Sequence, residues 1–238
     1  MRAAQHIAVL TGAGMSAESG VPTFRDAQTG LWASFKPEEL ATPEAFLRNP
    51  KLVWDWYAWR RELVEGVKPH AGHLALVQLE QRVRQFTLIT QNVDGLHQVA
   101  GSHNVHELHG NIRRVKCFDC GRISPLPQKQ ALEVKKVPRC THCNGLLRPD
   151  VVWFGELLPA AEFQVARDAA GACDVFLSIG TSGLVEPAAS LPRLAQRNFA
   201  TVVYLNLDVK TESSTNVFRI HGKAGEVLPA LVAALHTA

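Results

Sequence analysis

Short apolar runs rich in β-branched residues recur along the chain at wide intervals, and helix-like stretches separate them. Four such runs are His6–Thr11, Phe86–Thr90, Val175–Ile179 and Thr201–Asn206. Strands that are apolar throughout and alternate with helices are typical of a parallel sheet covered by helices on both faces. The pattern therefore predicts an α/β fold built on a Rossmann-like parallel sheet.

Two regions interrupt this alternation. Residues 36–84 have a mostly helical pattern rich in Trp, Glu and Arg, and Thr42 followed by Pro43 marks a helix start. Residues 113–148 carry four cysteines and many turn-forming residues. We expect both regions to form a smaller lobe, the first as a helical insertion and the second as a cysteine-rich module. The sheet domain would then consist of residues 1–35, 85–112 and 149–238.

Length and composition narrow the class of protein. A chain of 238 residues can bury a large core, and 46% hydrophobic with 20% charged residues is ordinary for a soluble globular protein. A formal net charge of +3 is too small to predict binding to nucleic acid or to a membrane. The first apolar run, Ile7 to Leu10, is short and has no cleavage signature, which favours a buried strand over a signal peptide. No stretch reaches the length of a transmembrane helix. We therefore expect a cytoplasmic protein.

Most of the cysteines are arranged for metal binding. Cys117 and Cys120 form one CxxC pair, Cys140 and Cys143 form a second, and 19 residues separate the pairs. This spacing is typical of a four-cysteine zinc site. Four thiolates complete the tetrahedral coordination of zinc, so the single metal ion should be structural. His142 could compete as a ligand, although four cysteines suffice, and four unrelated reduced thiols are the alternative.

The first predicted strand runs into a glycine-rich loop, Gly12-Ala13-Gly14-Met15-Ser16-Ala17. A GxGxxA pattern at the end of a strand suits a dinucleotide, whose pyrophosphate would meet the N-terminus of the following helix. Small-residue turns after strands are also common, so the loop alone leaves a purely structural turn open. An ordinary dehydrogenase would carry an acidic residue about 20 residues later, at the end of a second strand. Because no strand is predicted before Lys36, the nucleotide would be held in an unusual pose.

A cluster of polar residues follows the second predicted strand. Gln91, Asn92 and Asp94 come directly after it, at the edge where α/β proteins bind their ligands. His109 follows a further short strand-like run, and its imidazole titrates near neutral pH, as a general base should. A lone histidine is more often structural, but this one joins a set of residues suited to catalysis.

Several longer motifs occur along the chain. They are GAGMSAESGVPTFRDAQTGLW (Gly12 to Trp32), TQNVDGLH (Thr90 to His97), His109-Gly110, Gly180-Thr181-Ser182 and Asn206-Leu207-Asp208. In this order they closely resemble the motifs of the sirtuins, over residues 5–225. The resemblance implies a zinc-containing enzyme that uses NAD to remove acyl groups from lysine side chains. The products would be nicotinamide, free lysine and O-acyl-ADP-ribose, so the acyl group is transferred to ADP-ribose.

The same resemblance implies a role for each motif. His109 would be the base that activates a ribose hydroxyl, while Asn92 and Asp94 orient nicotinamide and ribose. Phe24 and Arg25 would belong to a loop that covers the site and excludes water. The residues expected to bind NAD are Gly12, Ala13, Gly14, Ser16, Ala17, Thr23, Phe24, Arg25, Trp32, Gln91, Asn92, Val93, Asp94, Gly180, Thr181, Ser182, Asn206, Leu207, Asp208 and Ala224.

The segment Trp56–Arg61 indicates which acyl group the enzyme would remove. Tyr57 and Arg60 are three residues apart, so on a helix they share a face, and a phenol beside a guanidinium suits a carboxylate. The alternative is an amphipathic helix with its tryptophans packed inward and its arginines in solvent. The Tyr-x-x-Arg pair, together with the small Ala41, resembles the acyl-pocket residues of the sirtuins that act on succinyl- and malonyl-lysine. We therefore predict a desuccinylase and demalonylase that keeps some deacetylase activity. The other expected substrate contacts, in a segment resembling the family's peptide-pairing strand, are Val152, Trp153, Phe154 and Gly155.

Two other functions stay open on the sequence. The same NAD site could transfer ADP-ribose to a protein, and the product would then be a modified protein. The chain could instead be a non-catalytic NAD-binding or zinc-ribbon interaction module. His109 together with Asn92 and Asp94 argues against the module, because a sensor would not need this set. We expect acyl-lysine proteins or peptides as partners, and neither nucleic acid nor a membrane.

Overall fold

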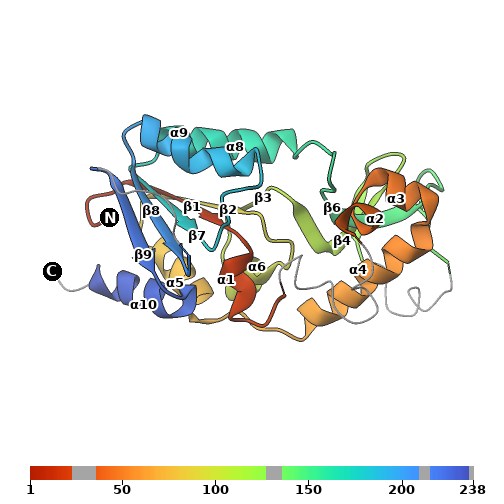
Figure 1. Ribbon diagram of the computed structural model, residues 1–238, viewed down its shortest axis with the longest axis horizontal. Helices are drawn as coiled ribbons and strands as arrows, with labels where there is room; N and C mark the ends of the chain where they lie inside the picture. Colours follow the sequence, from red (N-terminus) through yellow and green to blue (C-terminus); the bar gives the residue numbers. More distant parts are fainter. Residues whose placement is uncertain (23–35, 127–135, 209–214, 236–238) are drawn as a thin grey trace.

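The computed structural model describes residues 1–22, 36–126, 136–208 and 215–235, which form two lobes (Figure 1). The larger lobe contains a six-stranded sheet in the order β3-β2-β1-β7-β8-β9. Every neighbouring pair in it is parallel, so the predicted parallel Rossmann-like sheet is confirmed. Its strands are β1 (His6–Thr11), β2 (Gln85–Thr90), β3 (Val105–Glu107), β7 (Val175–Ile179), β8 (Thr201–Asn206) and β9 (Val217–His221).

Helices cover both faces of this sheet, which explains why its central strands are apolar throughout. All residues of β1 and β7 are buried. On β1, Ile7 and Val9 join one core cluster, whereas Ala8 and Leu10 join the other, as the two-residue repeat of a strand requires. Figure 1 shows α8 and α9 over one face and α5 and α10 over the opposite face. The helices of this lobe are α1 (Ala13–Ala17), α5 (Ala71–Glu80), α6 (Leu96–Ala100), α8 (Ala160–Ala172), the short 3-10 helix η2 (Ala188–Ser190), α9 (Leu191–Arg197) and α10 (Ala224–Ala234).

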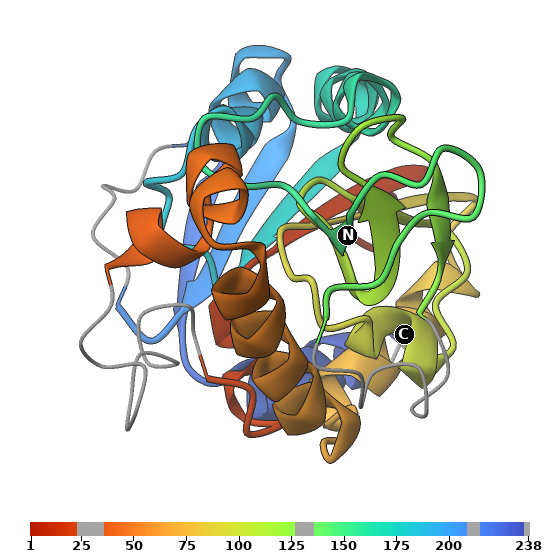
Figure 2. The same cartoon turned by 90° about the vertical axis from the view of Figure 1, so that its right-hand side faces the viewer.

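The smaller lobe combines helices with an antiparallel sheet. Its strands, in the order β5-β4-β6, are β5 (Ile123–Pro125), β4 (Gly110–Cys117) and β6 (Leu147–Val151). Its helices are α2 (Pro37–Leu40), α3 (Pro43–Arg48) and α4 (Pro50–Glu65). The expected helix start is confirmed, because the Thr42 side chain accepts a hydrogen bond from the backbone N–H of Ala45. Figure 2 shows the long helix α4 crossing the front of this lobe beside the strands.

Helix α5 shows how the segments divide between the lobes. Residues 71–80 lie inside the segment expected to be a small-lobe insertion. However, Leu76 and Leu79 share a core cluster with Ile7 of β1. The exact boundaries stay a prediction, and this packing favours an end of the helical insertion before residue 71 instead of at 84. None of the helices in the described parts of the chain is long and apolar enough to cross a membrane.

Candidate active site

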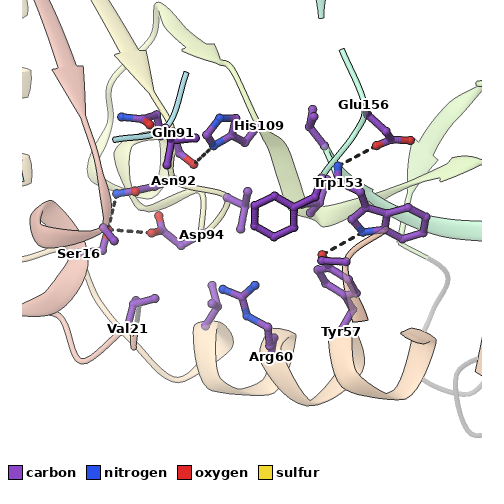
Figure 3. Close-up of a pocket in the computed structure, with 18 of the residues that line it drawn as sticks. Ser16, Val21, Tyr57, Arg60, Gln91, Asn92, Asp94, His109, Trp153 and Glu156 are labelled. Atoms are coloured by element: carbon purple, nitrogen blue, oxygen red, sulfur yellow. Dashed lines mark hydrogen bonds between the residues drawn. The ribbon is translucent and has the colours of Figure 1, made fainter. Parts of the chain in front are cut away.

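A cavity of about 290 Å³ lies where the two lobes meet (Figure 3). One wall comes from the carboxyl ends of β1 and β2, where parallel sheets bind ligands. Figure 3 shows Ser16, Asn92 and Asp94 on this wall, with Tyr57 and Arg60 rising from α4 on the other side. The predicted residues that line the cavity are Ala13, Ser16, Ala41, Tyr57, Arg60, Gln91, Asn92, Val93, Asp94, His109, Val152, Trp153 and Phe154. The cavity is also lined by residues without a predicted role: Val21, Pro22, Val64, Val151, Glu156, Leu158, Val185 and Glu186.

His109 lies between β3 and β4, with one ring nitrogen held by the backbone. Its Nδ1 donates to the carbonyl oxygen of Gln91 at 3.0 Å. The Nε2 nitrogen then carries the free lone pair of the neutral ring, which is what a general base needs. Burial lowers the pKa of His109 below its usual range, and the hydrogen bond to Gln91 opposes this effect. The ring is therefore neutral at neutral pH.

Asn92, Ser16 and Asp94 form one hydrogen-bonded group. The Asn92 amide donates to the carbonyl oxygen of Gly12 at 2.9 Å and to the hydroxyl of Ser16 at 3.0 Å. Ser16 in turn donates to Asp94 at 2.7 Å, and the backbone N–H of Leu96 donates to the same carboxylate at 2.8 Å. Burial raises the pKa of Asp94, while these donors act in the opposite direction. The group fixes polar side chains from two neighbouring strand ends.

The glycine-rich loop is pressed against the loop that follows β7. A Cβ atom at Gly12 would come within 2.8 Å of the carbonyl oxygen of Gly180, and one at Gly14 would come equally close to the Gly180 Cα. The backbone N–H of Gly14 also donates to the Gly180 carbonyl at 2.9 Å. Backbone packing is thus sufficient to require glycine at both positions. The role of this loop in binding NAD stays a prediction.

The other expected NAD-binding residues that the structure describes gather at the same edge of the sheet but outside the cavity. Asn206 ends β8, and its amide donates to the carbonyl oxygen of Thr181 at 2.8 Å. Leu207 and Asp208 follow it and are exposed, whereas Ala224 is buried at the start of α10. Of the other predicted residues, Ala17 ends α1, and Gly180 and Ser182 lie in the loop after β7. Four predicted residues lie outside the described parts of the chain: Thr23, Phe24, Arg25 and Trp32.

Tyr57 and Arg60 share the inner face of α4. Their exposed fractions are only 1% and 9%, and both line the cavity. The guanidinium of Arg60 lies 5.1 Å from the centre of the Trp56 ring. An amphipathic helix with its arginines in solvent is therefore wrong, and Arg61 is buried as well, over the ring of Trp54. The reason is that the tryptophan faces shelter both guanidinium groups.

A second group of side chains holds Tyr57 in place. The indole N–H of Trp153 donates to the Tyr57 hydroxyl oxygen at 3.0 Å. Arg148 stacks 3.2 Å from the centre of the Trp153 ring and pairs with Glu156. Burial raises the pKa of Tyr57 to about 12, so the phenol keeps its proton. Because the Tyr57 oxygen accepts from the indole, the Tyr57 O–H remains able to donate into the cavity.

The expected substrate segment does not form a strand. Residues 152–156 make a turn after β6, in which Gly155 has φ +84° and the backbone N–H of Glu156 bonds to the Trp153 carbonyl. The left-handed conformation of Gly155 ends the extended chain. Ala41 lies beside this turn, and its carbonyl oxygen accepts from the backbone N–H of Phe154 at 3.0 Å. Arg148 and Glu156 were not assigned from the sequence, although Glu156 follows the expected substrate residues directly.

The four paired cysteines converge in the small lobe. The sulfur atoms of Cys117, Cys120, Cys140 and Cys143 all lie within 4.8 Å of one another. A tetrahedral zinc ion with Zn–S bonds of about 2.3 Å places its sulfurs about 3.8 Å apart. The observed separations of 3.4 Å for Cys117–Cys143 and 3.9 Å for Cys120–Cys140 fit this arrangement. His142 is not part of the cluster. The donor set leaves no open position, so it suits a structural zinc ion.

Comparisons with known proteins point in one direction. A model of the Sir2 family matches residues 12–187. The NAD-dependent protein deacylase 2 of Pyrobaculum aerophilum is 52% identical over 98% of this chain and 92% of its own. The NAD-dependent protein deacylase of Ralstonia nicotianae is 50% identical over 98% of this chain and 93% of its own. A solved structure of a Sir2 homolog–NAD complex is 42% identical, with a TM-score of 0.89, over 98% of this chain and 90% of that one. A structure of Sir2 bound to acetylated peptide is 28% identical, with a TM-score of 0.85, over 98% and 94%.

The cysteine cluster leads to a prediction about metal content. We expect about one zinc ion per chain in the purified protein, and Cys140→Ala should lose the zinc and lower the free energy of unfolding, because the binding of structural zinc is coupled to folding. Cys173→Ala is the matched control, since Cys173 is also a buried free cysteine but lies outside the cluster. Metal analysis with thermal unfolding measures both effects. A folded Cys140→Ala protein that keeps its zinc would contradict the assignment.

Proposed function

The chain belongs to the Sir2 family of NAD-dependent protein deacylases, and we propose that it removes succinyl and malonyl groups from lysine side chains in preference to acetyl groups. The observation that carries this proposal is the pair of buried side chains Tyr57 and Arg60. They line the same cavity as His109, Asn92 and Asp94. One cavity would thus bring a site for an acidic acyl group to the residues that act on NAD.

NAD is the co-substrate in this proposal. The names of the relatives and the solved NAD complex of a Sir2 homolog support it. The acyl-lysine carbonyl oxygen attacks the anomeric carbon of the NAD ribose, and the bond to nicotinamide breaks. Asn92 and Asp94 hold nicotinamide and ribose in position for this step. The glycine-rich loop and the residues from Gly180 to Ser182 hold the phosphates, and Asn206 and Asp208 hold the adenosine ribose.

His109 carries the next proton transfer. A ribose hydroxyl attacks the carbon of the resulting imidate, and its proton passes to Nε2 of His109. Water then releases free lysine, and the acyl group stays on ADP-ribose. The hydrogen bond from Nδ1 to the Gln91 carbonyl supports this role, since it leaves Nε2 as the basic nitrogen. The zinc ion in the cysteine cluster has no part in these steps and stabilises the small lobe.

The charge of Arg60 favours an acidic acyl group in this part of the cavity. Arg60 is almost completely buried, and burial lowers its pKa below the usual range. A carboxylate at the end of a succinyl or malonyl chain would give this guanidinium a bidentate partner. The Tyr57 hydroxyl, whose oxygen already accepts from Trp153, would donate to the same carboxylate. Ala41 leaves room for the longer chain. An acetyl group offers no such partner, so it would be a poorer but still accepted substrate. The expected cytoplasmic location stays a prediction.

The proposed base can be tested by substitution. His109→Gln and His109→Tyr should lower kcat for deacylation by about 10²–10⁴-fold, the usual contribution of a general base. Thermal unfolding and NAD affinity should change little, because the ring makes one hydrogen bond and its backbone contacts remain. Single-turnover kinetics measures the rate, circular dichroism measures thermal unfolding, and calorimetric titration measures the NAD affinity. A folded variant with normal turnover would remove His109 from the mechanism.

The pH dependence follows from the same residue. The base works in its neutral form, so activity is present above the folded-state pKa of His109 and is lost as the pH falls through it. Because burial lowers this pKa in the free protein, the acid limb of the kcat/KM profile should lie below the ordinary value of 6.5. A midpoint above 6.5 would contradict this environment for the ring.

The acyl preference is tested by two neighbouring arginines. Arg60→Met should lower kcat/KM on a succinyl-lysine peptide by at least about 30-fold and on the acetyl-lysine peptide by no more than about threefold, because losing the partner of a buried carboxylate costs roughly 2–5 kcal/mol. Arg61→Met is the matched control, since Arg61 is equally buried on the same helix but does not line the cavity. Arg61→Met should leave the ratio of kcat/KM for the succinyl-lysine peptide to kcat/KM for the acetyl-lysine peptide unchanged. Equal losses on both substrates in Arg60→Met would mean that the pair only packs the helix.

A further inference from the structure

A buried chain of hydrogen bonds connects residues outside the cavity to Asn92 in its polar wall. It begins at His97 in α6, whose Nε2 lies 2.9 Å from the hydroxyl oxygen of Thr11. Thr11 donates to the hydroxyl oxygen of Thr90 at 2.8 Å, and Thr90 also accepts from the backbone N–H of Asn92 at 3.0 Å. Thr11 and Thr90 are direct partners at the carboxyl ends of β1 and β2.

The protons in this chain have one consistent arrangement. Thr11 has a single hydroxyl proton, which it gives to Thr90, so its oxygen must accept from His97. His97 is therefore protonated on Nε2, and its Nδ1 has no hydrogen-bond partner among the described residues. The His73 ring, which is completely buried, packs 5.0 Å from the His97 ring and holds it from the side of α5. The direction of donation thus runs from His97 through Thr11 to Thr90.

The chain ends on a residue of the proposed site. The backbone of Asn92 is held by Thr90, and its side chain then donates to Gly12 and Ser16. The histidine side of the site is held differently. The backbone N–H of Gln91 donates to the backbone carbonyl oxygen of Thr11, so the Thr11 hydroxyl takes no part in this contact. The hydroxyl of Thr11 therefore acts on Asn92, and not on the Gln91 carbonyl that orients His109.

We propose that His97, Thr11 and Thr90 are positioning residues, which fix the backbone of Asn92 so that its side chain meets NAD in the reactive orientation. The inference rests on the proposed role of Asn92 in the reaction. The three residues touch no substrate themselves, and none of them lines the cavity. Their effect passes through one backbone N–H group.

The same two strands offer a matched control. His6 and Thr87 form a second buried histidine–threonine hydrogen bond, 3.1 Å long, toward the opposite end of β1 and β2. Neither residue lines the cavity. Substituting Thr87 should therefore cost stability as substituting Thr11 does, but it should leave catalysis alone.

The test compares Thr11→Val, Thr11→Ser and Thr87→Val in the full chain. Valine keeps the shape of threonine and removes the hydroxyl, whereas serine keeps the hydroxyl. Thr11→Val should lower kcat by at least about tenfold, because small misplacements in an active site cost one to two orders of magnitude. Thr11→Ser should restore most of the loss. Thr87→Val should keep the wild-type kcat despite a similar drop in the free energy of unfolding.

A second variant and a binding measurement complete the test. Thr90→Val removes the shared acceptor and should repeat the effect of Thr11→Val, so the inference stays testable if one variant does not fold. NAD affinity, measured by calorimetry, should fall in Thr11→Val and Thr90→Val but not in Thr87→Val. A wild-type protein without deacylase activity would contradict the proposed function, and these NAD affinities would then decide the inference alone. Equal kcat and equal NAD affinity in Thr11→Val and Thr87→Val, or no rescue by serine, would overturn it.

Discussion

The parallel pairing of β1 with β2 is the interaction on which the site depends. It runs in register from His6 opposite Gln85 to Thr11 opposite Thr90, and both strands end at the same edge of the sheet. The glycine-rich loop leaves one strand there and the polar residues from Gln91 to Asp94 leave the other. A slip of one residue in this register would turn the core side chains of β1 to the wrong face, so the hydrophobic core and the active site are specified together.

The small lobe supplies the opposite wall under a different constraint, the burial of charge. A guanidinium inside a protein is tolerated only where partners or aromatic faces compensate for the loss of water. Arg148 meets this condition through Glu156 and the Trp153 ring, and this group in turn holds Tyr57. Arg60 lies over Trp56 and faces the cavity. In the proposed function, the carboxylate of the acidic acyl group binds to this buried cation.

The local pattern of the sequence predicted the sheet well, because each buried strand is a short apolar run between turns. The predicted His6–Thr11, Val175–Ile179 and Thr201–Asn206 match the observed strands, and β2 begins one residue earlier than expected. The cysteine spacing likewise predicted the cluster. The sequence could not show that Arg61 is buried or that α5 packs on the large sheet, since both depend on distant residues. The contact between Thr11 and His97 spans 86 positions and has no local signature.

The most direct test is a competition among acyl groups. Peptides of one sequence carrying succinyl-, malonyl- or acetyl-lysine would be mixed in equal amounts and incubated with the protein, with and without NAD, and followed by mass spectrometry. We expect loss of the acyl groups only with NAD, the succinyl and malonyl peptides consumed first, and O-acyl-ADP-ribose formed in equal amount to free lysine. Faster loss of the acetyl group, or ADP-ribose attached to the peptide, would contradict a cavity built for acidic acyl-lysine.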